Sequence, residues 1–221
     1  MDDSLRWIGH STVLVELDGV RLLTDPLLRE RVVLLRRAEP LDIGSLDDLD
    51  AVLISHIHYD HLDLGSLRRL RGPRTVVVPR GAGALLRRSV QASVEELGVE
   101  EVLEVGAVTV KAVRAEHDSS RLFGKKTDAL GYVVSGSRRI YFLGDTDLFP
   151  ELEDAAPGTD VALIRPRTAV PIHWGTYYPV TARKSTRDFL RAPVAEFEKA
   201  AAELAPEVDV RVLPVGGTLE L

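Results

Sequence analysis

The chain has 221 residues, of which 45% are apolar, so it can bury one sizeable core and we expect a single domain over residues 1–221. Its formal net charge of −6 argues against a nucleic-acid partner, because a phosphate backbone requires a basic surface. The chain has no cysteine, which excludes disulfides, thiolate metal sites and cysteine nucleophiles. The opening MDDSLRWIGH lacks a leader pattern, and no apolar run reaches the roughly 18 residues of a membrane span. We therefore expect a cytoplasmic protein without a transmembrane segment.

The predicted elements of the first half of the chain are short and mostly strands. Residues 12–26, TVLVELDGVRLLTDP, alternate apolar and polar side chains around Asp18-Gly19, which predicts a β-hairpin. Residues 27–49 show no clean period and are predicted to form a loop. Four elements follow in order: a buried strand at 50–55, a short helix at 63–73, a strand at 74–79 and an amphipathic helix at 82–97 ended by Gly98.

The second half again contains more strands than helices. Its predicted elements are two paired strands at 100–106 and 107–117, a hairpin at 129–145 with its turn near 135–138, short buried strands at 160–164 and 168–172, a helix at 193–205 and closing strands at 208–221. Helices fall between groups of strands. This order predicts an α/β fold with two packed sheets covered by helices.

Histidine and aspartate gather where predicted strands end. Three of the six histidines stand in ISHIHYDHLD, residues 54–63, directly after a buried strand. The candidates at strand ends are His56, His58, Asp60, His61, His117, Asp145 and His173. Strand ends are rigid and can converge on one sheet edge, as a metal site requires. A histidine at a strand end is by itself usually an ordinary loop residue, and this applies to His10.

The spacing within the cluster is suited to binding cations. His56 and His58 are two residues apart, so both rings project to one side of an extended chain and can hold one cation. Asp60 and His61 follow a turn and can face a second cation, although Asp60 could equally cap the next helix. Ligands that offer imidazole and carboxylate without sulfur suit Zn, Mn, Fe, Co or Ni.

Taken together, these motifs resemble a known family. HIHYDH, the strand end at His117, FLGDTD and PIHWGT resemble the successive metal motifs of the metallo-β-lactamase superfamily, over nearly the whole chain. RWIGHSTVLVELDGVRLLTDP resembles the opening of one branch, which holds ascorbate-6-phosphate lactonase-like hydrolases and N-acyl-phosphatidylethanolamine phospholipase D-like enzymes. The resemblance implies a four-layer αβ/βα sandwich with the site at one edge of the paired sheets.

The resemblance also implies a role for each candidate. One metal would be held by His56, His58 and His117, the other by Asp60, His61 and His173, with Asp145 bridging the two. Asp25 matches the first motif of the family. It would orient the loop at residues 54–63, which we call the histidine loop, by contacting the ligands without binding the metal itself. His10 recurs in the opening of this branch, which moves it toward the edge of the site.

The expected function is hydrolysis by a dinuclear centre. Two divalent cations, zinc in the first place with Mn, Fe, Co or Ni as alternatives, would share a hydroxide that attacks an ester, a lactone or a phosphodiester. Asp60 and Asp145 are the candidate catalytic residues, and Asp60 would hold the attacking hydroxide in line. A single-iron sulfur dioxygenase-like oxidoreductase keeps the same H-x-H-x-D-H pattern and stays the alternative. A metal-free binding module is disfavoured by the complete ligand set.

The surroundings of the centre suggest a small-molecule substrate, with a phosphorylated one as an option. Arg121, Lys125 and Lys126 follow His117 and could neutralise a phosphate, but they could equally lie in a solvated loop. Trp174 and Tyr177 follow His173 and could wall the pocket or simply pack. The sequence does not identify the substrate, the physiological metal or the oligomeric state.

One connection departs from the pattern of the family. Only residues 165–167 separate the predicted strands at 160–164 and 168–172, whereas parallel neighbours need a crossover of about a dozen residues or more. Relatives of this branch have a glycine-rich loop and a helix at this point. Either the chain has lost them, or a segment is missing between Ile164 and Arg165, and we favour the second interpretation.

Overall fold

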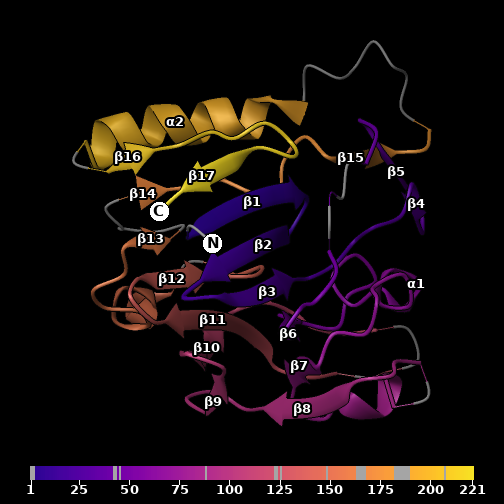
Figure 1. The fold of residues 1–221 in the computed structure, drawn as a ribbon. Coiled ribbons are helices and arrows are strands. Elements are labelled where there is room, and N and C mark those ends of the chain that lie inside the picture. Colours follow the sequence, from indigo (N-terminus) through magenta and orange to yellow (C-terminus); the bar gives the residue numbers. More distant parts are fainter. Residues whose placement is uncertain are drawn as a thin grey trace.

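The computed structural model describes residues 3–41, 44, 46–87, 89–121, 124, 126–147, 149–162, 168–181, 190–206 and 208–221. Two seven-stranded sheets pack face to face, and a small third sheet lies at one side (Figure 1). No helix among these residues is long and apolar enough to cross a membrane. The predicted α/β sandwich is confirmed.

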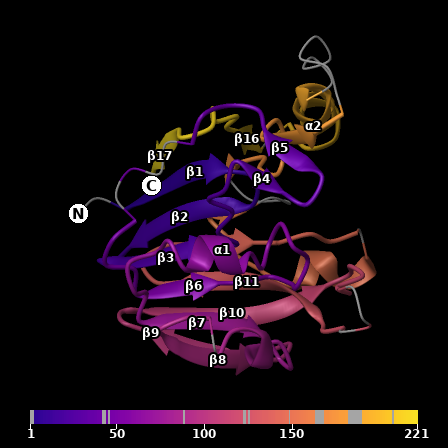
Figure 2. The same ribbon diagram turned by 90° about the vertical axis from the view of Figure 1, so that its right-hand side faces the viewer.

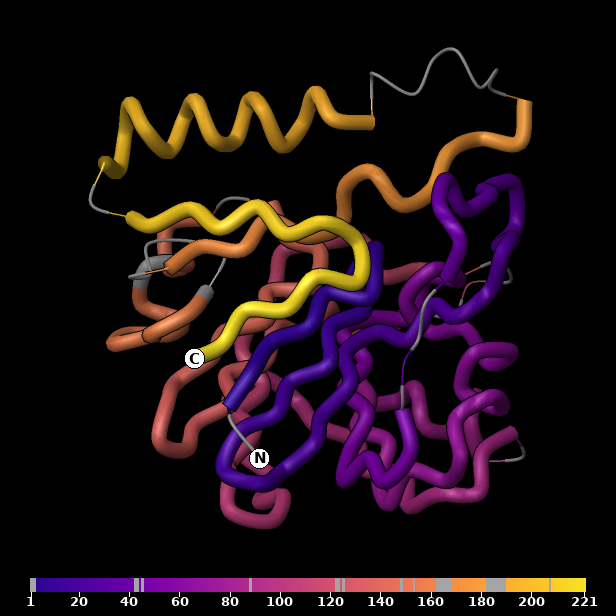
Figure 3. Tube along the Cα trace, turned by 45° about the horizontal axis from the view of Figure 1, so that its top comes forward, coloured from indigo at the N-terminus to yellow at the C-terminus, as the bar shows by residue number. Residues whose placement is uncertain are grey.

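The first sheet has the order β17-β1-β2-β3-β6-β7-β8. Its strands are β1 (Ser4–Gly9), β2 (Thr12–Leu17), β3 (Val20–Thr24), β6 (Ala51–Leu53), β7 (Thr75–Pro79), β8 (Ser93–Leu97) and β17 (Thr218–Glu220). The predicted β2–β3 hairpin turns at Asp18-Gly19, where both residues have positive φ. The last strand pairs with β1, so the first and last strands of the chain lie side by side (Figure 3). From β3 to β8 the pairing is parallel.

The second sheet has the order β16-β14-β13-β12-β11-β10-β9. Its strands are β9 (Val102–Val105), β10 (Val108–Ala115), β11 (Ala129–Ser135), β12 (Arg139–Phe142), β13 (Val161–Ala162), β14 (Thr168–Ala169) and β16 (Asp209–Val210). Pairing is antiparallel from β9 to β12 and parallel from β12 to β16. The questioned bond between Ile164 and Arg165 lies within residues 163–167, outside the described residues.

Alternating apolar side chains from the two sheets form the main core. In β10, Val108, Val110 and Ala112 point inward and are buried, while Thr109 is exposed. From the first sheet, Leu22 and Leu53 are fully buried against them. Burial of one such aliphatic side chain stabilises the fold by about 1.5–3 kcal/mol, so this interface fixes how the two sheets are placed.

The helices are few among the described residues. They are α1 (Leu64–Leu67), α2 (Ala192–Leu204) and the 3₁₀ turns Gly83–Leu85 and Pro150–Asp154. The helix α1 is capped by Asp63, whose carboxylate accepts a hydrogen bond from the Ser66 backbone N–H, so Asp60 is not the capping residue. The prediction of a helix near 193–205 is confirmed by α2, which lies beside β16 and β17 (Figure 1).

The predicted helix at 82–97 is wrong. A 3₁₀ turn begins this segment, and β8 ends it as an edge strand parallel to β7. In residues 90–97 the apolar side chains stand two or three positions apart (Val90, Ala92, Val94 and Leu97), which fits a strand as well as a helix. The Glu96 carboxylate accepts hydrogen bonds from the backbone N–H groups of Gly81 and Gly83, which ties the strand to the turn. Tertiary pairing therefore decides the conformation.

Residues 27–49, predicted as a loop, contain a small hairpin. Its strands β4 (Arg31–Val32) and β5 (Leu35–Arg37) pair with each other, and β5 also pairs with β15 (Tyr177–Pro179). This three-stranded sheet lies beside the strand ends on the right of Figure 1 and faces the viewer in Figure 2. It links the chain after β14 to the loop after β3.

Candidate metal centre

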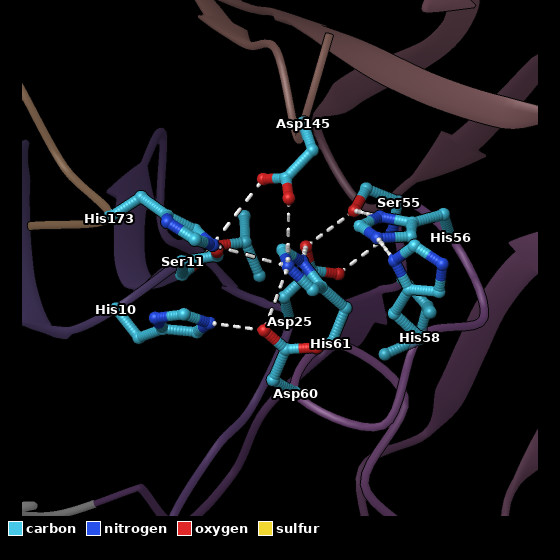
Figure 4. A network of polar contacts seen from close by, with 12 residues as sticks. His10, Ser11, Asp25, Ser55, His56, His58, Asp60, His61, Asp145 and His173 are labelled. Atoms are coloured by element: carbon cyan, nitrogen blue, oxygen red, sulfur yellow. Dashed lines mark hydrogen bonds and ion pairs between the residues drawn. The ribbon is translucent and has the colours of Figure 1, made fainter. Parts of the chain in front are cut away.

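Strand direction brings the predicted ligands to one edge of the sandwich. In the first sheet β1, β3 and β6 run in the same direction, and in the second sheet β10, β12 and β14 do so. The site residues that follow these six strands are His10, Asp25, His56, His117, Asp145 and His173. Figure 4 shows the side chains of His10, Asp25, His56, Asp145 and His173 directed toward one another and toward those of His58, Asp60 and His61, and His117 groups with His56 and His58. All six histidines of the chain therefore meet at this edge.

Three imidazoles form one half of the centre, which we call the imidazole half: His56, His58 and His117. The Nε2 atom of His56 lies 3.0 Å from Nδ1 of His58, and Nε2 of His117 lies 3.3 Å from the same atom. Two nitrogens bound to one tetrahedral zinc at about 2.0–2.1 Å would lie roughly 3.3–3.4 Å apart. The three nitrogens therefore have the spacing of ligands to one cation.

Asp60, His61 and His173 form the other half, which we call the carboxylate half. The Nε2 atoms of His61 and His173 are 3.3 Å apart, and Oδ2 of Asp60 lies 3.8 Å from Nε2 of His61. The His61 ring is fully buried, whereas the Asp60 side chain is 27% exposed. This half presents two nitrogens and an oxygen toward one point.

Asp145 lies between the two halves. Its Oδ2 is 3.4 Å from Nε2 of His61 and 4.0 Å from Nε2 of His117, while its Oδ1 is 3.5 Å from Nε2 of His173. One carboxylate therefore reaches ligand nitrogens of both halves, which is the geometry of a bridging ligand. Glycine precedes it for a steric reason: a Cβ on Gly144 would lie 2.6 Å from Cβ of Ser55.

Asp25 is completely buried and supports His61 directly and His56 through Ser55. Its Oδ2 lies 2.7 Å from Nδ1 of His61 and accepts a hydrogen bond of 2.5 Å from the Ser55 hydroxyl. Its Oδ1 accepts the backbone N–H of Ser55 at 2.7 Å. The Ser55 hydroxyl also lies 3.0 Å from Nδ1 of His56. These contacts leave the Nε2 atoms of His56 and His61 directed at the centre, as ligands require.

His10 lies at the carboxylate half and is only 5% exposed. Its Nε2 is 3.0 Å from Oδ2 of Asp60, and its ring centroid is 3.8 Å from that of His173. The backbone N–H of His10 donates to Oγ1 of Thr176 at 2.8 Å. His10 thus contacts two candidate ligands, and it is a member of the site rather than an isolated loop residue.

The electrostatics of the two halves differ. Burial and the neighbouring His61 lower the pKa of His56 to about 2, and burial and His117 lower the pKa of His58. Burial also acts against a charged His61, yet Asp25 and Asp145 raise the pKa of its ring to about 10. Despite burial, the hydrogen bond with His61 holds the pKa of Asp145 below its ordinary range. Burial therefore disfavours a positive charge on His56 and His58, whereas the carboxylates around His61 favour a positive charge there.

The histidine loop is held by polar groups from the segment after His117. The guanidinium of Arg121 donates to the carbonyls of Ile57 and Leu62, which flank the segment from His58 to His61, and it lies over the Tyr59 ring. Ser119 Oγ accepts the backbone N–H of Ile57 at 3.2 Å. Arg121 is thus occupied by the loop itself. Lys125, the other predicted phosphate contact, lies outside the described residues.

The aromatic residues after His173 pack closely around the site. Trp174 lies against Trp7, with ring centroids 5.3 Å apart, and its indole N–H donates to the carbonyl of Pro171. Tyr177 meets His10 edge-on at 5.5 Å, and its hydroxyl donates to the carbonyl of Arg29 at 2.5 Å. Both side chains thus have packing and hydrogen-bond partners within the protein.

Sequence reasoning missed two supporting residues. Ser55 connects Asp25 to His56, and Thr176 fixes the backbone at His10. Ser55 ends the buried strand just before the histidine motif, and this position is the signal that could have revealed it. Thr176 carries no comparable signal, because its partner is 166 residues away in sequence.

A divalent cation fits the donor set in each half. In the imidazole half three acceptor nitrogens converge, and a single proton can satisfy at most one pair of them. In the carboxylate half the ionised Asp60 and Asp145 face buried rings with no arginine or lysine among their ion pairs in the described part of the chain. Cations would satisfy both groups, because the ligands combine neutral imidazole and carboxylate.

Fold and site together define a sandwich protein with a His/Asp metal centre at one sheet edge. The chain belongs to the beta-lactamase superfamily: the Beta-lactamase superfamily domain matches residues 20–215, as the resemblance of its motifs predicted.

Solved structures show the same fold. Isothiocyanate hydrolase from Delia radicum gut bacteria has a TM-score of 0.72 at 20% identity and covers 99% of each chain. The metallo hydrolase Igni18 from Ignicoccus hospitalis has a TM-score of 0.71 at 21% identity, covering 100% of this chain and 99% of that one.

Relatives by sequence include proteins named as hydrolases. A UPF0173 metal-dependent hydrolase of Methanopyrus kandleri is 28% identical over 248 aligned positions, which cover 98% of this chain and 99% of that protein. N-acyl-phosphatidylethanolamine-hydrolyzing phospholipase D 1 of Caenorhabditis elegans is 29% identical and covers 77% of this chain and 63% of its own. An uncharacterized Mycobacterium bovis protein is 39% identical over 156 residues, 65% of this chain, but the chain spans only 42% of its length.

The alignment with the Methanopyrus protein is longer than the chain itself. It has 248 positions, whereas the chain has 221 residues. This relative therefore has residues for which the chain has no counterpart. The sequence predicts such a difference at the short connection between β13 and β14.

Proposed function

We propose that the chain is a metal-dependent hydrolase with two cations in one centre. His56, His58 and His117 hold the first cation, Asp60, His61 and His173 hold the second, and Asp145 contacts both. The observation that supports this most is the spacing of 3.0–3.3 Å between facing histidine nitrogens in both halves. Zinc is the proposed metal, because it prefers imidazole-rich, four-coordinate sites.

Two bound cations would supply an activated water and stabilise the negative charge that develops on the substrate. The residues of the chain orient the participants. Asp60 is half-buried, and despite the burial its hydrogen bond with His10 keeps its pKa below the ordinary value, so it stays an acceptor. An ionised carboxylate in this position can accept a hydrogen bond from the attacking water and thereby orient that water toward the substrate. Asp145 keeps the two halves at a fixed distance.

The proposed substrate is a small molecule with an ester, lactone or phosphodiester bond. Each of these has an electrophilic carbon or phosphorus that a water nucleophile can attack without a serine or cysteine. The phospholipase D relative acts on a phosphodiester according to its name, which supports the inclusion of this class. Since Arg121 contacts loop carbonyls, substrate charge would be met by the cations in the first place.

The test is a hydrolysis screen of esters, lactones and phosphodiesters with apoprotein and with metal-loaded protein. We expect turnover only with metal, and its loss in Asp60→Asn and His58→Ala. Asp118→Asn is the matched control, because this exposed carboxylate adjoins His117 but pairs with Lys126. The proposal is wrong if the protein binds no metal and both variants keep wild-type activity. One iron per chain with oxygen consumption would instead indicate the dioxygenase alternative.

A further inference from the structure

The β4–β5 hairpin ends in an apolar turn that projects into solvent. Val33 and Leu34 are 73% and 70% exposed. Val180 donates its backbone N–H to the Leu34 carbonyl at 2.9 Å and is itself 42% exposed. Among the described residues seven large apolar side chains are exposed, and three of them gather here. We call Val33, Leu34 and Val180 the apolar tip.

The turn is also conformationally unfavourable for these residues. Val32 pairs with Leu35, so Val33 and Leu34 form a two-residue turn. Val33 has a φ of 47°, which a β-branched residue rarely adopts and for which glycine is the usual choice at the first turn position. Folding alone would favour a small or polar pair. The exposed apolar side chains therefore point to a role outside the fold.

Just behind the tip, two arginines face each other across the hairpin. Arg31 and Arg36 are cross-strand partners, and both are exposed. Neither has an ion-pair partner among the described residues, whereas the nearby Arg29 is paired with Asp63. Like charges directly opposite one another destabilise a strand pair. An external anion would remove this repulsion.

We propose that this hairpin docks on the surface of an anionic phospholipid bilayer. Apolar side chains at the tip enter the boundary between headgroups and acyl chains, while Arg31 and Arg36 remain at the level of the lipid phosphates. A bilayer surface offers an apolar layer for the tip and, just above it, anionic phosphates for the arginines. These two layers are about as far apart as the tip and the arginine pair are along the hairpin. The overall charge of −6 does not prevent this, because salt screens exposed charges beyond about 8–10 Å.

A second copy of the chain fits the apolar tip and its arginines less well than a lipid surface does. A two-fold contact between two copies places the same patch on both sides, so it would bring two Arg31–Arg36 pairs together. A lipid surface instead supplies the missing negative charge. The hairpin and the metal centre lie on the same side of the molecule, joined through β15 and Tyr177, so docking would turn the site toward the bilayer (Figures 1 and 2).

The experiment is co-sedimentation of the full chain with vesicles of phosphatidylcholine alone or mixed with 30 mol% phosphatidylglycerol (about a third anionic lipid, enough to attract juxtaposed basic groups). We expect binding only to the anionic vesicles, weakened by added salt. The double variant V33G/L34S replaces the tip with residues that suit the turn. It should keep or raise Tm and lose most of the bound fraction.

Two further variants separate charge from apolar contact. R31Q/R36Q removes the repulsion, so Tm should not fall, but binding should decrease and lose its salt dependence. Leu204→Ser is the matched control, because Leu204 is 84% exposed at the end of α2, away from the hairpin, and binding should be unchanged.

The proposal is overturned if wild type does not bind the anionic vesicles, or if V33G/L34S binds as well as wild type. Sedimentation velocity without lipid gives the other decisive outcome. A wild-type dimer that V33G/L34S converts to a monomer would assign the tip to self-association and would contradict lipid docking. A monomer in both cases agrees with the proposal.

Discussion

The two halves of the metal centre have different support. In the imidazole half three rings converge, and Ser55 is the hydrogen-bond partner behind His56. In the carboxylate half His61 pairs with the buried Asp25 at 2.7 Å, and Asp60 pairs with His10 at 3.0 Å. His61 and Asp25 thus form an ion pair that persists without a cation, whereas the contact of Asp60 with His10 is a hydrogen bond, because burial lowers the pKa of His10 to about 4. In the imidazole half the shortest contacts at the centre are between ring nitrogens, and the carboxylate of Asp145 lies 4.0 Å from His117, so the geometry of this half depends on a cation more strongly.

This difference teaches how such a site is built from one chain. Burial lowers the pKa of His56, whereas the charged His61 has the carboxylate of Asp25 behind it. His61 is fully buried and braced, so it can anchor the centre before any cation binds. His58 is partly exposed, and its hydrogen-bond contacts among the described residues are to the rings of His56 and His117. Its side chain can therefore move when a cation enters.

Removing one ligand from each half should have the largest effect. His58→Ala in the imidazole half and His173→Ala in the carboxylate half each remove several kcal/mol of transition-state stabilisation, which corresponds to about a 10³-fold loss of kcat/KM. Each variant should also lose one metal equivalent. Steady-state kinetics and elemental analysis of the same samples check this. Normal metal content in either variant would show that the removed histidine is not a ligand.

Asp25→Asn should weaken the carboxylate half selectively. It removes the charge behind His61 and disturbs the Ser55 network, and changes to such supporting groups typically lower metal affinity about 10–100-fold. Competition with a chromogenic chelator measures both affinities. We expect the affinity of the carboxylate half to fall, and that of the imidazole half, which is affected only indirectly through Ser55 and His56, to stay within a few-fold. An equal shift of both equivalents would contradict the distinction between the halves.

His10→Phe should have a smaller effect. Phenylalanine preserves the ring packing against His173 and Tyr177 but removes the contact with Asp60. We expect kcat to fall about tenfold, the lower limit for a group that orients a ligand, with metal content unchanged. His10→Gln, which can still donate to Asp60, should recover part of the activity. A loss of bound metal in His10→Phe would mean that His10 is itself a ligand.

Arg121→Leu should affect both halves modestly, because Arg121 holds the shared histidine loop. Loss of its two carbonyl contacts should lower the free energy of unfolding by about 1–2 kcal/mol, after allowance for the partial exposure of the side chain. For a chain of this size Tm should fall by roughly 3–6 °C. Lys126→Leu is the control, because its ion pair with Asp118 is exposed and should contribute little. An unchanged Tm in Arg121→Leu would refute this role.

Much of the site was predictable because its ligands follow strands. Apolar runs before His56, His117, Asp145 and His173 mark strand ends, and strands of common direction end at one edge. The assignment of each ligand to a particular metal came from the family resemblance and stays a proposal. The role of Arg121 was not predictable, because a basic residue after His117 fits a phosphate contact as well as a contact with the histidine loop.

The fold was predictable where the pattern of side chains was unambiguous. The alternation in residues 12–26 and 107–117 matches β2, β3 and β10. The segment 82–97 failed because its apolar spacing suits both periods and pairing with β7 decided between them. The β4–β5 hairpin was missed because its turn carries Val33 and Leu34 instead of glycine or asparagine.

The number of metal ions per chain tests the central claim most directly. Protein reconstituted with excess zinc and freed of unbound metal should contain two ions per chain by elemental analysis, and one in His58→Ala. A value of one in wild type, with full hydrolytic activity and no further change in His173→Ala, would contradict the dinuclear centre.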